Sequence, residues 1–227
     1  MARRDQLLPS YFPIWNRYVS IYRTAFDRAL VLLSREPKTW EKEEEITEFL
    51  ATILSKVCFD LRPEYPDDKI PVPIWEAPKQ PKTQAELTGG KKQKRPDFTC
   101  NIYIENADNL EQGEIPLHIE CKLLGSPTSR TWVLNKNYVA DGIARFDLSS
   151  HEYGKRASTG LMIGYLMNMA PIEILSEVNA HLQGIFDHHP PLQFLFGPIV
   201  VECIQRFHRK VVEPVDFEMI HIWVDLR

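Results

Sequence analysis

Asp97, Glu120 and Lys122 are the residues of this sequence whose types and spacing are best suited to chemistry. Glu120 and Lys122 are two residues apart in an apolar stretch, so in an extended strand their side chains leave the same face of a sheet. His118 shares that face. Burying charged groups without a purpose costs much free energy, so these residues indicate a site on the strand pair.

This set of groups suits metal-assisted hydrolysis of a phosphodiester bond. Asp97 and Glu120 offer hard oxygen ligands, which Mg²⁺ prefers and Mn²⁺ also accepts, and the backbone carbonyl of Cys121 can be a further ligand. A bound divalent ion lowers the pKa of a coordinated water and neutralises charge on the phosphate. Lys122 would position that water or stabilise the developing negative charge.

An acidic run at residues 41–45 offers a further carboxylate to this site. The run begins a predicted helix, where the helix dipole favours negative charge. At about 100° per residue, Glu43 falls on the core-facing side, three residues before Ile46, whereas Glu44 points away and Glu45 lies at the margin. We therefore choose Glu43 as the fourth catalytic residue. The alternative is that the whole run is a solvated first turn.

Several basic residues near these acids are candidates for contact with a nucleic-acid backbone. They are Lys91, Lys92, Lys94 and Arg95, in the loop before Asp97, and Lys136 and Arg145, on a predicted later helix. The alternative is a solvated charged surface. The net charge of -4 excludes a uniformly basic nucleic-acid coat, and it argues against tight, sequence-independent DNA binding by this chain alone.

The histidines and cysteines give no comparable pattern. His181, His188 and His189 cluster near a predicted helix end, but no cysteine or carboxylate sits at ligand spacing, which favours surface histidines over a zinc site. His118 is either a contact to substrate or metal or a hydrogen-bonded sheet residue. The four cysteines are scattered without a CxxC pair, so we expect reduced thiols. Cys121 should face the core, which argues against a role as nucleophile.

Hydrophobic periodicity predicts the elements that must position these residues. Apolar residues at steps of three and four predict a helix over Tyr11–Leu33, which Pro37 ends. A second helix should begin near Thr39, a residue type that suits an N-cap, and continue through Val57. Residues 1–60 are therefore expected to form a helical N-terminal part.

A change of texture follows at residues 61–95, which are rich in proline and end in the basic run. This composition predicts a long loop with one short extended piece at Ile70–Trp75, and such a long irregular segment is more often functional than not. Alternating apolar residues then predict an antiparallel pair of strands, Asp97–Ile104 and Ile115–Leu124, joined by a turn at Asn106–Gly113.

Further elements complete a predicted sheet core over residues 96–227. They are a helix over Asn135–Phe146, a buried strand over Gly160–Met169, a helix with Pro171 in its first turn, and strands over Ile199–Phe207 and Phe217–Leu226. This order of elements predicts a mixed α/β domain with a helical N-terminal layer.

The residues Pro96-Asp97, the strand with Glu120-Cys121-Lys122 and the acidic helix upstream together resemble the PD-(D/E)xK nuclease superfamily. The later segments Tyr138–Phe146 and Phe217–Trp223 resemble small endonucleases of bacterial antiphage systems. The resemblance implies a restriction endonuclease-like core, with a central mixed sheet flanked by helices and with three meandering strands before a helix. It also implies that the aspartate and the glutamate bind metal, that the lysine acts on the attacking water, and that a glutamate from the preceding helix completes the site.

We therefore expect a single nuclease domain over residues 1–227 that acts as a metal-dependent endodeoxyribonuclease, with Mg²⁺ as cofactor and Mn²⁺ as its substitute. The resemblance also implies DNA as the substrate and a role as the nuclease effector of an antiphage defence system. A partner subunit or a homodimer would supply recognition and control. The alternatives are a catalytically silent nuclease-fold module that binds nucleic acid or scaffolds a complex, and a DNA repair or junction nuclease.

Composition limits the setting in which this chemistry takes place. The hydrophobic fraction of 44% and the charged fraction of 26% are typical of a folded globular protein. The sequence has no apolar stretch near the roughly 20 residues needed to cross a bilayer, and no apolar segment follows the N-terminal charges as in a secretory signal. We therefore expect a cytoplasmic protein without a membrane partner.

Overall fold

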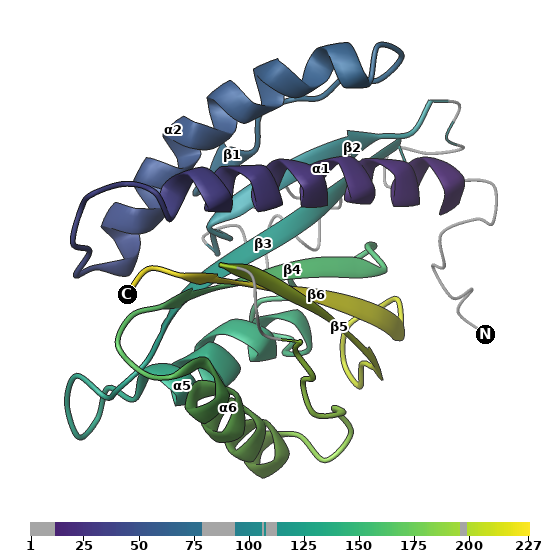
Figure 1. Ribbon diagram of the computed structural model, residues 1–227. Coiled ribbons are helices and arrows are strands. Elements are labelled where there is room, and N and C mark those ends of the chain that lie inside the picture. The colour runs from purple at the N-terminus through teal and green to yellow at the C-terminus, as the bar shows by residue number, and fades with distance from the viewer. Residues whose placement is uncertain (1–11, 79–93, 106, 108–112, 196–198) are drawn as a thin grey trace.

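The computed structural model describes residues 12–78, 94–105, 107, 113–195 and 199–227. Its centre is a six-stranded mixed sheet with the strand order β1-β2-β3-β4-β6-β5, and helices cover both faces of this sheet (Figure 1). The predicted α/β class, with a mixed sheet flanked by helices and a helical N-terminal layer, is confirmed.

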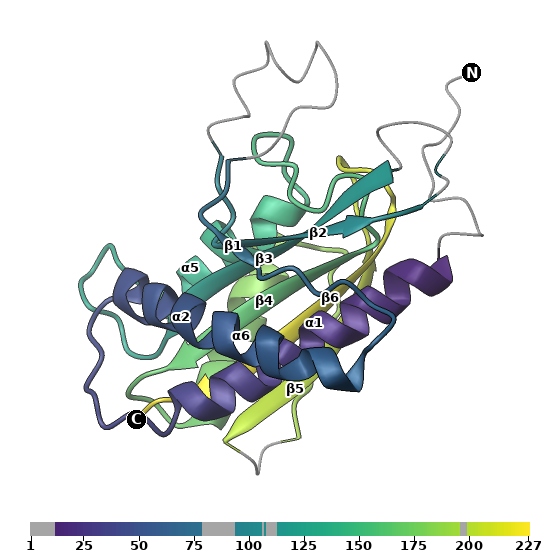
Figure 2. The ribbon, with the colours of Figure 1, turned by 90° about the horizontal axis from the view of Figure 1, so that it is seen from above.

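Two long helices, α1 (Phe12–Leu33) and α2 (Glu43–Leu61), lie side by side over one face of the sheet (Figure 2). The apolar residues predicted to share one side of α1 are all buried: Trp15, Val19, Tyr22, Phe26, Leu30 and Leu33. The hydrophobic period therefore identified both the helix and the face that packs on the sheet.

The predicted start of α2 near Thr39 is wrong. The helix begins at Glu43, and the N-cap position belongs to Lys42, whose backbone is extended and whose side chain makes no capping hydrogen bond. Trp40 is buried and packs on Phe49, with 5.3 Å between the ring centroids. This contact holds the chain against the helix before the first turn, much as a hydrophobic staple does.

The opposite face of the sheet is covered by α6 (Pro171–Ile185) and by a helical segment of three parts (Figure 1). The parts are α5 (Leu134–Asn137), the π-helical turn η4 (Tyr138–Gly142) and the 3-10 turn η5 (Ile143–Phe146). The helix predicted over Asn135–Phe146 is therefore present but is not a uniform α-helix. Pro171 occupies the first turn of α6 as predicted, because its missing N–H would have no helical partner there.

One side of the sheet is an antiparallel meander of β1 (Ile74–Trp75), β2 (Phe98–Tyr103) and β3 (Glu114–Leu124). The predicted antiparallel pair is confirmed in β2 and β3. The extended piece predicted over Ile70–Trp75 forms a strand only at its last two residues, because the prolines at 71 and 73 have no N–H to donate to a neighbouring strand. A 3-10 turn, η2 (Arg62–Glu64), precedes it.

The other side of the sheet is built on β4 (Thr159–Leu166), which pairs in parallel with both β3 and β6 (Asp216–Asp225). The edge strand β5 (Val200–His208) is antiparallel to β6. Every residue of β4 is buried, as predicted for a central strand. All three strands begin and end within three residues of their predicted bounds.

The sheet separates two apolar cores. Ile119 and Cys121 of β3 belong to the core under α1 and α2, so the side chains of Glu120 and Lys122 leave the strand toward the other face. The four cysteines are free, as expected, and all of them are buried. No helix in the described part of the chain has both the length and the apolar composition that a membrane span requires.

Candidate functional site

The site lies where β3 extends beyond its pairing with β2. On this overhang, the N–H groups of Cys121 and Leu123 have no partner strand among the described residues. Instead, Asp97 Oδ2 accepts the N–H of Cys121 at 2.6 Å, and Glu43 Oε2 accepts the N–H of Leu123 at 3.0 Å. Two carboxylates therefore take the place of a neighbouring strand, which satisfies the backbone and fixes both acids.

Lys122 joins these acids into one cluster. Its Nζ lies 2.7 Å from Glu43 Oε1, 2.9 Å from Glu120 Oε1 and 3.9 Å from Asp97 Oδ2. The ammonium also donates to the backbone carbonyl of Cys121 at 2.6 Å. The structure thus brings together the four residues predicted as catalytic, together with the carbonyl predicted as a ligand. We call Glu43, Asp97, Glu120 and Lys122 the acid site.

Glu120 is the most deeply buried member of the acid site, with a side chain that is 0% exposed. Burial raises its pKa to about 8, the charge of Asp97 adds to this shift, and Lys122 and Arg145 oppose it. Its Oε2 has no hydrogen-bond partner among the described residues. A buried carboxylate oxygen without a partner costs free energy, and it is the kind of atom that a bound cation would satisfy.

The pKa values of Lys122 and Asp97 are also shifted by burial and by the neighbouring charges. Burial alone would lower the pKa of Lys122, but the charges of Glu120, Asp97 and Glu43 together raise it above its ordinary value. Burial raises the pKa of Asp97, against the opposing effects of Lys122 and of the Cys121 N–H. Lys122 is therefore held as an ammonium, which donates hydrogen bonds and does not act as a base.

The π-helical turn η4 packs directly behind the acid site. A Cβ added at Gly142, its last residue, would lie 3.4 Å from Lys122 Cγ and 2.6 Å from Met162 Cε. A side chain there would displace the end of Met162 and come into contact with the stem of the lysine, so η4 lies close against the acid site. π-helical turns are frequently found at functional sites.

Arg145, predicted to contact a nucleic-acid backbone, pairs its guanidinium with Glu120 Oε1 inside the acid site. No spacing in the sequence connects η5 to β3, so this contact could not be read from a motif. The contact of Arg145 with nucleic acid stays a prediction. Arg145 also lies 6.0 Å from the ring centroid of Tyr153.

The other basic candidates are placed in part. Lys94 is half-buried and Arg95 is exposed, just before Asp97. Lys136 is exposed on α5. Lys91 and Lys92 lie outside the described residues. These positions leave the predicted nucleic-acid contact a prediction.

The donor set of the acid site fits a hard divalent ion. Asp97, Glu120 and the Cys121 carbonyl supply oxygen, and Glu120 Oε2 is a buried oxygen in need of a partner. A group of three metal-binding residues, with one ligand atom from each within 4.8 Å of the others, lies elsewhere among the described residues, at Asp147, His188 and His189. An ion at the acid site would therefore have few protein ligands and would keep several waters, as Mg²⁺ does.

The histidines are more buried than expected. His118 accepts a hydrogen bond from the Gly154 N–H on Nδ1 at 2.9 Å, which fits the alternative of a hydrogen-bonded sheet residue. The surface position predicted for His188 and His189 is wrong for His189, whose side chain is 0% exposed. The carboxylate that accompanies them, Asp147, is 41 residues from His188 in the sequence, so no local spacing could have revealed it.

Comparisons of the chain with protein-family models, with curated proteins and with solved structures found no match. Any statement about the function of this protein therefore depends on the geometry of its own residues.

Proposed function

We propose that this protein is a metal-dependent endodeoxyribonuclease of the PD-(D/E)xK superfamily. The observation that carries the proposal is the convergence of Glu43, Asp97 and Glu120 on the Lys122 ammonium, with a buried oxygen of Glu120 still lacking a partner. Three carboxylates and a lysine come together from α2, from β3 and from the residue directly before β2, although these segments lie far apart in the sequence.

The arrangement of the sheet supports the same proposal. The meander β1–β2–β3 places Asp97 directly before β2 and Glu120 and Lys122 on β3, and a helical segment then leads to the parallel strand β4. This agrees with the restriction endonuclease-like core implied by the motif resemblance, in which the motif lies on the second and third strands of a meander.

Each residue of the acid site has a role in this proposal. Asp97, Glu120 and the Cys121 carbonyl would hold Mg²⁺, which when bound acidifies a coordinated water and neutralises charge on the phosphate. Lys122, as an ammonium, would orient the attacking water and stabilise the negative charge that develops. Glu43 holds Lys122 in place through the 2.7 Å contact, and Arg145 neutralises and orients Glu120.

The biological role follows the motif resemblance. We propose a cytoplasmic nuclease effector of an antiphage defence system that acts on DNA. Since the chain carries a net charge of -4, recognition of DNA would draw on a partner subunit or a second copy in addition to local basic residues.

The test is cleavage of supercoiled plasmid, linear DNA and RNA by the purified chain with Mg²⁺, Mn²⁺ or EDTA. We expect DNA cleavage with either metal and none in EDTA. Glu120→Gln and Lys122→Met should each lower the rate by on the order of 10²-fold or more. The control is Glu44→Gln, which changes an exposed acid in the same helical turn as Glu43 and should cut like the wild type.

Three results would overturn the proposal. Undiminished cleavage in excess EDTA would exclude the metal mechanism, and full activity of Lys122→Met would exclude the acid site. A wild-type chain that binds DNA but cuts no substrate with either metal would favour the catalytically silent module.

A further inference from the structure

A second cluster of metal-binding side chains lies away from the acid site and shares no residue with it. His188 Nε2 lies 3.0 Å from Asp147 Oδ2, and His189 Nε2 lies 3.9 Å from the same oxygen. One ligand atom from each of the three residues lies within 4.8 Å of the other two. Asp147 directly follows η5, and the two histidines lie in the connection between α6 and β5, so the cluster joins two separate parts of the fold.

His189 is the member of this cluster whose environment most favours a bound metal ion. Its imidazole is stacked between the rings of Phe186, at 4.2 Å between centroids, and Phe207, at 3.7 Å. Both ring nitrogens are buried and have no hydrogen-bond partner among the described residues. Buried polar atoms without a partner are rare and costly. An unprotonated imidazole nitrogen carries the lone pair that a metal ion accepts.

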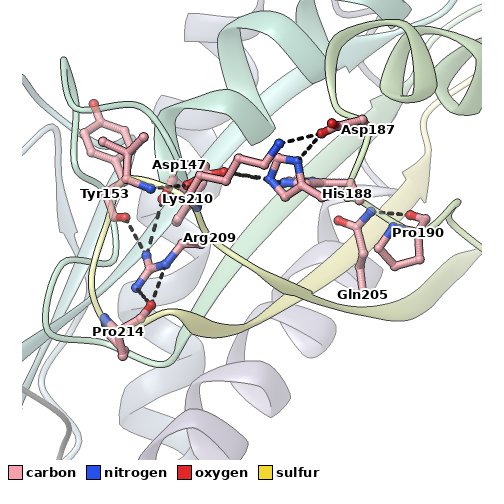
Figure 3. A network of polar contacts seen from close by, with 12 residues as sticks. Asp147, Tyr153, Asp187, His188, Pro190, Gln205, Arg209, Lys210 and Pro214 are labelled. Atoms are coloured by element: carbon pink, nitrogen blue, oxygen red, sulfur yellow. Dashed lines mark hydrogen bonds and ion pairs between the residues drawn. The ribbon is translucent and has the colours of Figure 1, made fainter. Parts of the chain in front are cut away.

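The groups around the cluster already hold its ligands in a binding orientation. Asp187 Oδ1 lies 2.9 Å from His188 Nδ1, which directs the opposite nitrogen toward Asp147 (Figure 3). Asp147 Oδ1 accepts the backbone N–H groups of Lys210 at 2.9 Å and Val211 at 3.3 Å. These contacts leave Asp147 Oδ2 directed at the histidines. Carboxylate partners behind a ligating histidine are the usual outer shell of a zinc ion.

The spacing of the ligand atoms suits a tetrahedral ion. Ligands bound to Zn²⁺ at about 2.0 Å in a tetrahedron lie about 3.3 Å from one another, and the two distances to Asp147 Oδ2 are 3.0 and 3.9 Å. Two imidazoles and one carboxylate match the ligand types of zinc, whereas Mg²⁺ prefers oxygen alone.

A cavity of about 820 Å³ is lined in part by His188 and His189, between the start of α1, the end of β5 and the start of β6. With three protein ligands, the fourth position of a tetrahedral ion would be filled by water.

We propose that Asp147, His188 and His189 form a binding site for a zinc-class transition-metal ion, which fastens the connection between α6 and β5 to the end of η5. This inference does not depend on the proposed nuclease function. It predicts a metal site distinct from the acid site, for which we propose a harder ion.

The test is metal binding by the full chain, freed of any histidine tag and stripped with a chelator. Zinc is titrated in competition with a chromophoric chelator, and Co²⁺ is added separately to look for the visible absorption of a tetrahedral complex. We expect one zinc-binding site with a tetrahedral Co²⁺ spectrum. Loss of a ligand in His188→Ala or Asp147→Asn should weaken zinc binding by at least the ~10–100-fold that loss of an outer-shell partner costs.

Both variants should fold without metal, so a loss of zinc binding can be assigned to the loss of a ligand. His188 is half-buried, and Asn at 147 keeps an oxygen for the N–H groups of Lys210 and Val211, so both proteins should fold, as circular dichroism without metal would show. His181→Ala, a histidine of α6 outside the cluster, is the matched control and should bind zinc like the wild type. Asp97→Asn should also bind zinc normally, because it alters only the acid site.

The proposal is overturned if the wild-type chain takes up no zinc, or if His188→Ala and Asp147→Asn both bind zinc as tightly as the wild type. It is also overturned if zinc binding is lost in Asp97→Asn, since the ion would then belong to the acid site.

Discussion

Replacing Glu120 with glutamine should stabilise the metal-free protein, and the gain should grow as the pH rises. Burial and the neighbouring Asp97 raise the pKa of Glu120 from 4.5 to about 8, so the folded state keeps a proton that the unfolded chain releases above pH 4.5. The unfolded state is therefore increasingly favoured between these two values. Glutamine has the shape of the protonated acid but cannot titrate, so the variant escapes this loss.

The two pKa values set the size of the effect. Each pH unit between them costs the wild type up to about 1.4 kcal/mol of unfolding free energy relative to the variant. With values of 4.5 and about 8, the difference between the two proteins should grow by about 2.5 kcal/mol from pH 5 to pH 7. This contribution is fully present below pH 4.5 and is lost by pH 8.

The assay is urea unfolding of both proteins in EDTA at pH 5 and pH 7, with Glu44→Gln as the control for removal of an exposed carboxylate. Saturating Mg²⁺ should reduce the deficit of the wild type at pH 7, because an ion bound by the carboxylate favours its ionised form. A difference in unfolding free energy that is the same at both pH values would refute the reasoning, because Glu120 would then titrate as a solvated acid.

Four further predictions test separate parts of the structure. Lys122→Met should abolish cleavage yet leave Mn²⁺ binding intact or slightly tighter in a titration, because it removes a positive charge beside the ion; loss of Mn²⁺ binding would contradict the assigned role. Asp97→Ala should lower the unfolding free energy by ~1–3 kcal/mol relative to Asp97→Asn, because alanine leaves the Cys121 N–H without its 2.6 Å acceptor; equal urea midpoints would count against this contact. His221→Gln should make the unfolding free energy less sensitive to acid, because burial lowers the pKa of His221 to about 3. The folded wild type keeps this ring neutral while the unfolded chain takes up a proton, so the wild type should lose about 2 kcal/mol of unfolding free energy relative to the variant from pH 7 to pH 5. Urea unfolding of both proteins at the two pH values measures this difference. The last variant has alanine at the four basic loop positions, Lys91, Lys92, Lys94 and Arg95. The slope of log K for DNA binding against log salt should fall by up to about 0.9 for each phosphate that the loop no longer neutralises. An unchanged slope would place DNA binding elsewhere.

The sequence was sufficient for features that follow from local periodicity. The step of three and four along α1 predicted which of its side chains are buried, and the alternation along β2 and β3 predicted the two strands and the shared face of Glu120 and Lys122, because the period of an element fixes its faces. The choice of Glu43 used the same argument on α2, and this is the glutamate whose carboxylate reaches Lys122.

Features that depend on tertiary contacts could not be predicted in this way. The start of α2 depends on where Trp40 finds a partner, which is Phe49. The contact of Arg145 with Glu120 and that of His188 with Asp147 join segments 25 and 41 residues apart. No periodicity connects such positions, and a single sequence carries no other signal for them.

The overhang of β3 explains why the fold produces a site at this place. β3 has 11 residues and β2 has 6, so part of the β3 edge must find hydrogen-bond acceptors outside the meander. Pro96, two residues before the first residue of β2, has no N–H to donate, so the strand cannot extend past Asp97 by regular pairing. The chain therefore presents the Asp97 side chain to the Cys121 N–H in place of another stretch of backbone. Pro96 thus prevents β2 from covering this part of the β3 edge, and Asp97, which follows it, contributes a carboxylate to the edge that stays uncovered.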